Sequence, residues 1–170
     1  MTVQPQVSSS QLVINGRFEV RERLAVDGFG ELFGATDRKT GKPVSLRPLV
    51  AQAEAHARQT LKVLGSFNHA NVVQTYGVIS SESGAPFIVQ GPLTGQPLAS
   101  FVATHARSGK PISLRGAYNV VAHVCNALSA IHATGPHGAV RPSAVWMHDD
   151  GRVQLSDLLI ARTFLAQGGT

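Results

Sequence analysis

Residues 137–161 read HGAVRPSAVWMHDDGRVQLSDLLIA, and this segment decides the fold of the chain. Its middle predicts two short strands, residues 145–147 and 153–155, because short apolar runs stand on either side of a polar turn. The turn, residues 148–151, ends in the Asp-Gly pair that is typical of hairpins. We therefore expect a small hairpin, with Asp157 placed two residues after its second strand.

The residues before this segment predict a helical region. Ser113 is a good N-cap for a long helix, and apolar residues recur at helical spacing as far as Ala133. Gly135 then stops the helix, and a shorter helix is expected over residues 98–105. Cys125 lies within the apolar pattern of the long helix, so we expect it to be a buried, unreactive thiol.

The first ninety residues predict a sheet with one helix inserted. Apolar and polar residues alternate in several short runs, and the period changes to a helical one between Ala53 and Leu64. The glycines of Gly28-Phe29-Gly30 mark the first turn between strands. The five expected strands are residues 18–26, 32–35, 44–49, 72–79 and 86–89, with the helix after the third.

Seven segments, in this order along the chain, resemble motifs of the protein kinase family. The first three are LAVDGFGEL at 24–32, similar to the glycine-rich loop, VSLR at 44–47, similar to V-A-I-K, and HANVV at 69–73, similar to H-P-N-I-V. The others are IVQGPLTGQPL at 88–98 (the hinge), LSAIH at 128–132 (the end of the long helix), HGAVRPSAV at 137–145 (H-R-D-L-K-P-x-N-I) and VQLSDLLIA at 153–161 (the strand into D-F-G).

This resemblance implies an α+β, protein-kinase-like fold: a five-stranded antiparallel N-lobe sheet with a C-helix, and a partial helical C-lobe. We expect the N-lobe to comprise residues 14–92 and the partial C-lobe residues 93–162, which end just after the D-F-G-like position. Residues 1–13 and 163–170 are expected to be flexible tails.

The resemblance also assigns five positions to the catalytic centre of the family. Arg47 stands where a Lys pairs with the phosphates of ATP, and Thr60 stands where a Glu on the helix pairs with that Lys. Ala139 replaces the catalytic base and Ala144 the magnesium-binding Asn, and neither side chain can accept a proton or bind a metal. Asp157 keeps the aspartate of D-F-G. The expectation is a pseudokinase that is not an enzyme.

Two of these positions have alternative interpretations. Arg47 is expected either to point to solvent or to pair with a nearby carboxylate. Asp157 either caps a turn after the strand or binds a metal ion, and one carboxylate is a poor magnesium site. No metal site and no cofactor are therefore expected.

The candidates for nucleotide binding are Gly28, Gly30, the charged Arg47 and the backbone N–H of Leu93. Two of the three glycines in the family motif are replaced, one of them by Asp27. A carboxylate there adds negative charge where the phosphates would lie.

Composition narrows the classes of partner. The chain has fifteen Lys and Arg against ten Asp and Glu, but the basic residues are scattered and no basic run is interleaved with aromatic residues. We therefore expect no nucleic-acid partner. No apolar run approaches membrane length and no signal peptide opens the chain, so a cytoplasmic protein is predicted.

The expected function is protein binding. The resemblance ends before the helices that cover the long helix in the family, so its apolar residues predict a docking surface. The expected interface is Val120, Val121, Val124, Leu128 and Ile131. The partner is a protein, either a second copy of the chain or an active Ser/Thr kinase. The alternative is a nucleotide-sensing protein that binds ATP weakly without phosphotransfer.

Overall fold

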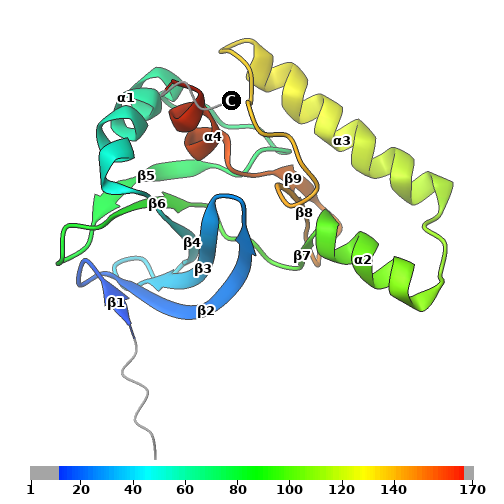
Figure 1. The fold of residues 1–170 in the computed structure, drawn as a ribbon, viewed down its shortest axis with the longest axis horizontal. Helices are drawn as coiled ribbons and strands as arrows, with labels where there is room; N and C mark the ends of the chain where they lie inside the picture. The colour runs from blue at the N-terminus through cyan, green and yellow to red at the C-terminus, as the bar shows by residue number, and fades with distance from the viewer. Residues whose placement is uncertain (1–11, 167–170) are drawn as a thin grey trace, which may run out of the picture.

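The computed structural model describes residues 12–166, and it divides them between a curled antiparallel sheet and a mainly helical half (Figure 1). The sheet has six strands in the order β1-β2-β3-β4-β6-β5. They are β1 (Val13–Ile14), β2 (Phe18–Asp27), β3 (Gly30–Asp37), β4 (Pro43–Pro48), β5 (Thr75–Ser80) and β6 (Pro86–Gln90). The α+β fold is therefore confirmed, with one strand more than expected.

The additional strand β1 changes the expected N-terminal boundary. Val13 pairs with Glu19 of β2, so this residue belongs to the sheet and not to a tail. The rest of the predicted tail, apart from Leu12, lies outside the described residues. Helix α1 (Glu54–Leu64) follows a short 3₁₀ turn (Ala51–Ala53) after β4, as the change of period predicted.

The second half contains a three-stranded sheet and three helices. β7 (Gln96–Pro97) pairs with β8 (Val145–Met147), and β8 pairs with β9 (Val153–Leu155). The expected hairpin is thus found at its predicted residues. Helices α2 (Leu98–Ser108) and α3 (Leu114–His132) lie on the outer side of this sheet (Figure 1). Ser113 is the N-cap of α3, and its Oγ accepts a hydrogen bond from the Gly116 N–H at 3.1 Å.

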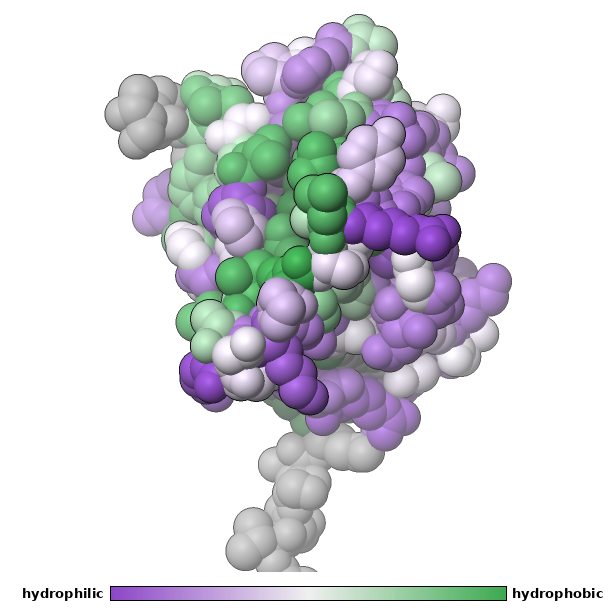
Figure 2. All heavy atoms as spheres, turned by 90° about the vertical axis from the view of Figure 1, so that its right-hand side faces the viewer, coloured by the Kyte–Doolittle hydropathy of each residue, from purple (hydrophilic) through white to green (hydrophobic). Residues whose placement is uncertain are grey.

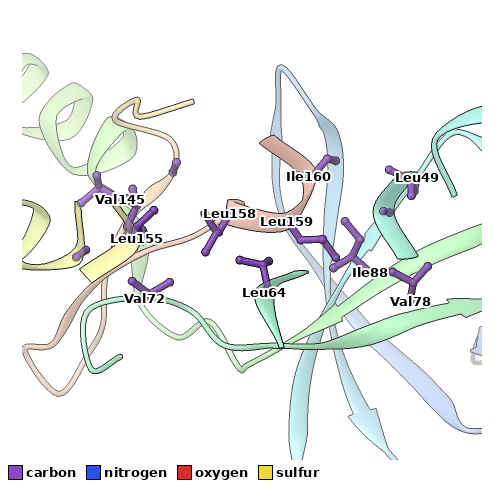
Figure 3. Close-up of a cluster of buried hydrophobic side chains, with 14 of the residues drawn as sticks. Leu49, Leu64, Val72, Val78, Ile88, Val145, Leu155, Leu158, Leu159 and Ile160 are labelled. Carbon is purple, nitrogen blue, oxygen red and sulfur yellow. The ribbon is translucent and has the colours of Figure 1, made fainter. Parts of the chain in front are cut away.

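Helix α4 (Leu158–Ala166) replaces much of the expected C-terminal tail. Its first four residues and Thr163 are buried, and Thr163 Oγ1 donates to the carbonyl of Leu159. Figure 3 shows Leu158 and Leu159 between the β8–β9 hairpin and the large sheet, with Leu64 of α1 beside them. The helix forms because these apolar side chains complete a core that the two halves share.

Cys125 is exposed, so the prediction of a buried thiol was wrong. The buried side of α3 is formed by Val124, Ala127, Leu128 and Ile131, which recur at intervals of three and four residues. Cys125 follows Val124 directly, and successive helical residues point about 100° apart. It therefore lies on a different face of α3.

Candidate functional site

The side chain of Arg47 lies in the centre of the molecule, where β4 passes beneath the turn between β2 and β3. Its Nη1 and Nη2 atoms donate to the two carboxylate oxygens of Asp27, at 3.0 and 3.1 Å. Nη2 also lies 3.0 Å from Oδ1 of Asp157. The side chain is 1% exposed, so the interpretation that it points to solvent was wrong and the pairing with a carboxylate is confirmed.

Arg141 completes a cluster of four charges. Its Nη2 atom lies 3.1 Å from Asp157 Oδ2 and 3.4 Å from Asp27 Oδ2, and its Nε donates to Ser143 Oγ. The charge cluster is thus Asp27, Arg47, Arg141 and Asp157, drawn from β2, β4, the loop before β8 and the residue before α4. Two cations face two anions, so the buried charges balance.

The β2–β3 turn, Gly28-Phe29, is fixed onto this cluster. Asp27 Oδ1 accepts the backbone N–H of Phe29 at 2.8 Å, and Gly30 adopts a φ of +93°, which favours glycine. The Phe29 ring stacks on that of Phe164 in α4, with centroids 5.5 Å apart. The guanidinium carbon of Arg141 lies 4.0 Å from the centre of the Phe29 ring. The turn therefore contacts the helical half through charges and through aromatic rings.

Burial dominates the electrostatics of Asp157. It raises the pKa of this carboxyl above its usual value, while the nearby Arg47 opposes the rise and the Asp27 carboxylate adds to it. Asp157 also has a φ of +68°, an uncommon conformation for a residue other than glycine. A buried acid in a strained backbone, between two guanidinium groups, is the type of position at which functional sites are found.

Comparison with known sequences assigns the chain to a family. The family model described as "Protein tyrosine and serine/threonine kinase" matches residues 18–168. The chain belongs to this protein kinase family.

Named relatives are bacterial and fungal kinases of low identity. Serine/threonine-protein kinase PknA of Mycobacterium tuberculosis is 25% identical over 162 residues, covering 89% of this chain and 37% of the relative. Aurora kinase of Schizosaccharomyces pombe is 26% identical over 149 residues, covering 84% of this chain and 41% of the relative. The probable serine/threonine-protein kinase PknB of Corynebacterium glutamicum is 28% identical, covering 88% of this chain and 24% of the relative. The chain thus spans less than half the length of each.

These names correct one prediction. The sequence predicted that the chain is not an enzyme, but the relatives are named serine/threonine-protein kinases, which points to an enzyme. The kinase family and the kinase-like fold are as the seven sequence motifs predicted.

The kinase-family position Thr60 lies apart from the charge cluster. Thr60 lines a cavity of about 280 Å³ with Arg162, between α1 and α4. The nearby Glu54 accepts hydrogen bonds from Arg58 and Ser80. These bonds hold the pKa of its carboxyl below the usual value, although burial opposes the change. The partners of Arg47 are therefore Asp27 and Asp157 and not an acid on α1.

Ala139 and Ala144 lie on the loop that leads into β8. Ala144 is fully buried, and its carbonyl accepts hydrogen bonds from the backbone and side chain of Ser156. The backbone N–H of Ala139 donates to Nδ1 of His137, whose Nε2 lies 2.9 Å from the Ser156 carbonyl. Since neither alanine carries a side-chain acceptor, the carboxylates of this site are those of the charge cluster.

The structure brings together three of the four nucleotide candidates. Gly28 lies in the turn above Arg47 and Gly30 follows it, with its carbonyl 3.4 Å from Arg47 Nη1. Leu93 instead packs in a separate apolar cluster around Trp146, one of the largest fully buried side chains. Within residues 12–166, no group of three or more His, Cys, Asp or Glu residues is arranged to hold a metal ion.

The expected interface on α3 is largely turned inward. Of its five residues, Ile131 is fully buried, so its assignment to an interface was wrong, and Val121 is the exposed one. The other three are half-buried against the core: Val120, Val124 and Leu128. The exposed apolar side chains lie on the adjacent side of α3, where Leu114, Tyr118 and Val121 recur at helical spacing.

Of these three side chains, Val121 also lines a groove that the sequence did not predict. It lies between α2 and α3, has a volume of about 480 Å³ and is lined mainly by apolar residues such as Phe101, Val102, Ile112 and Val121. Figure 2 looks onto this side of the molecule and shows a band of hydrophobic residues with hydrophilic ones beside it. Among the described residues, no helix is long and apolar enough to cross a membrane.

The two helices that form the groove contain basic residues and no acidic ones. No Asp or Glu occurs anywhere between Glu82 and Asp149, whereas Arg107, Lys110 and Arg115 are all exposed close to the groove in sequence. A second groove, of about 520 Å³, lies on the large sheet and is bordered by the Arg17–Asp37 ion pair. The α2–α3 groove thus differs in that its two helices and the segment between them carry cations and no carboxylate.

Proposed function

We propose that this kinase-family region is a regulatory protein-binding module that docks an acidic amphipathic helix of a partner protein in the α2–α3 groove. The observation that carries the proposal is an exposed apolar groove built from two helices that contain basic residues and no acidic ones. The partner is defined by this chemistry: one apolar face for the groove and carboxylates for its surround.

The apolar part of the surface supplies the attraction. Val121, which lines the groove, is 59% exposed, and Tyr118 and Leu114, on the adjoining side of α3, are 75% and 87% exposed. Burying apolar surface contributes about 25 cal/mol per Å². Large side chains aligned in this way are characteristic of an interaction site, whereas single exposed apolar residues are ordinary.

The charges select the occupant. A symmetric dimer through this groove would bring Arg107, Lys110 and Arg115 of the two copies near one another, and like charges repel. A partner helix with Asp and Glu beside its apolar face is instead attracted to these cations. The part of α3 that lines the groove extends from its N-cap Ser113 to Val121, a length of about 12 Å, which matches about two turns of a partner helix. An active Ser/Thr kinase that presents such a helix fits this groove as a partner.

Fluorescence anisotropy with a designed peptide tests the proposal. The probe is a labelled helical peptide with Leu on one face and Glu on the others, and a peptide with Lys in place of Glu is the control. We expect the Glu peptide to bind, and Val121→Asp to weaken its binding by at least about ten-fold. Arg115→Glu should also weaken it and reduce its dependence on salt.

A matched variant separates this surface from any other exposed valine. Val63 on α1 is 66% exposed, close to the 59% of Val121, so Val63→Asp introduces the same charge at a similar exposure elsewhere. It should leave peptide binding unchanged. Equal binding of the Glu and Lys peptides, or equal loss in the two valine variants, would contradict the proposal. A dimer that Val121→Asp dissociates in light scattering would make a second copy the occupant.

A further inference from the structure

The second inference concerns the charge cluster, where a carboxylate of the chain itself fills the space between two guanidinium groups. Asp27 accepts two hydrogen bonds from Arg47 and lies 3.4 Å from Arg141. We propose that Asp27 is an internal autoinhibitory contact: it occupies an anion site formed by Arg47 and Arg141, so that a polyphosphate group binds only after the β2–β3 turn has moved away. This proposal is independent of the groove.

The charge balance explains why Asp27 is the residue that blocks the site. With Asp27 present, two cations face two anions; without its charge, Arg47 and Arg141 face Asp157 alone. The Arg47 and Asp157 side chains are 1% and 0% exposed, so bulk salt screens the resulting positive charge little. An anion with several oxygens, such as pyrophosphate, can then accept the guanidinium hydrogen bonds that Asp27 accepts now.

The β2–β3 turn is joined to the rest of the sheet through an irregular stretch of β2 and β3. Below it, the pairing of β2 with β3 is irregular at two places, between Val20 and Glu22 and between Arg23 and Ala25. Such irregularities bend a strand and interrupt its ladder, so the tip beyond them is less firmly joined to the sheet. Its contacts with the helical half are the Asp27 ion pairs and the Phe29 ring against Phe164 and Arg141, while Leu32 at its base packs in the cluster around Trp146.

Isothermal titration of the whole chain with inorganic pyrophosphate tests the proposal. Asp27→Asn keeps the shape of the side chain and an acceptor for the Phe29 N–H but removes the charge. We expect Asp27→Asn to bind pyrophosphate at least about ten-fold more tightly than the wild type. Adding Arg47→Met to Asp27→Asn should abolish the gain.

Asp37→Asn is the matched control. Asp37 is also buried and also accepts two hydrogen bonds from one arginine, Arg17, but it lies outside the charge cluster. Asp37→Asn should gain no affinity for pyrophosphate. An equal gain in both Asp→Asn variants, or no gain in Asp27→Asn, would overturn the proposal.

If Asp27→Asn does not fold, a second variant tests whether the β2–β3 turn blocks the anion site. Phe29→Leu removes the ring contacts of the turn and leaves all four charges in place. It should bind pyrophosphate more tightly than the wild type, by less than Asp27→Asn would, because the turn opens more readily while Asp27 still competes. Affinity equal to that of the wild type in Phe29→Leu would then overturn the proposal.

Discussion

The Nη1 atom of Arg47 lies 3.0 Å from Oδ1 of Asp27, which joins the middle of β4 to the last residue of β2. The two residues are 20 positions apart, and the contact exists because the sheet curls and brings the β2–β3 turn above β4. Through Asp157 the same guanidinium also reaches the start of α4. One arginine thus connects the sheet, its first turn and the helical half.

Replacing Arg47 by methionine should destabilise the fold strongly. The change leaves Asp27 and Asp157 close together in a buried place with only the partly exposed Arg141 between them. Removing one partner of a buried ion pair lowers the free energy of unfolding by about 3–5 kcal/mol. Urea denaturation measures this change.

The exposed pair Arg23–Glu31 is the control for Arg47. Its side chains are 60% and 47% exposed, with the same 3.0 Å separation of charged atoms. Arg23→Met should lower the free energy of unfolding by less than about 1 kcal/mol. Similar losses in the two methionine variants would show that burial of the charge cluster contributes nothing to the free energy of unfolding.

Trp146→Ala should leave a cavity that an aromatic molecule can fill. Trp146 is 1% exposed and packs against Leu32, Val73 and Leu93. Truncating a buried aromatic residue lowers the free energy of unfolding by about 3–5 kcal/mol, and apolar cavities of this kind bind small aromatic molecules. Adding indole should restore part of the loss. Tyr118→Ala, at a 75% exposed position, should lose less than about 0.5 kcal/mol and show no response to indole.

Stability should fall in mild acid because of His137. Burial lowers the pKa of this imidazole below 6.5, and its Nδ1 accepts the Ala139 N–H, a bond that protonation removes. Below pH 6.5 the unfolded chain therefore binds more protons than the folded one, so the free energy of unfolding decreases as the pH falls.

Denaturation between about pH 7 and pH 5 checks this sign. His137→Gln should be less stable than the wild type at neutral pH but lose less stability on acidification. Part of the fall remains in this variant, since burial lowers the pKa of His148 as well. His132→Gln, at an exposed position at the end of α3, should keep the dependence of the wild type. A steeper fall in His137→Gln than in the wild type would be inconsistent with this assignment.

Gly95 should tolerate no side chain, because it lies against the hairpin. It has a φ of +74°, and a Cβ atom there would collide with the carbonyl oxygen of Met147 in β8. Gly84 has a similar φ of +81° but nothing near its Cβ position. Gly84→Ala should cost about 1–2 kcal/mol from backbone strain alone. Gly95→Ala should cost clearly more in thermal denaturation, and equal losses would show that the hairpin moves aside freely.

Local signals made much of the fold predictable. The hairpin of β8 and β9 and the start of α3 lie where the Asp-Gly turn and Ser113 placed them. Helix α4 was missed because its first residues form a continuous apolar run, in which helical and strand periods cannot be distinguished. The exposed face of α3 was misassigned because small residues such as Ala127 occur on several sides of the helix, and only packing decides which side is covered.

The charge cluster could be predicted only in part. Asp27 was recognisable as a negative charge in a phosphate-binding motif, and Arg47 as a cation facing that motif. Their direct pairing depends on the curl of the sheet, which the strand pattern does not specify. The pairing with Arg141 depends in addition on how the two halves pack, and no local signal carries that information.

Amide proton–nitrogen correlation spectra with the Glu peptide test the α2–α3 groove most directly. The account predicts that signals from the groove residues Val102, Gly116 and Val121 shift on addition of the peptide. Signals from Val44 and Gly77, in the groove on the large sheet, should stay in place. Shifts confined to the groove on the large sheet, or no shifts in α2 and α3, would contradict it.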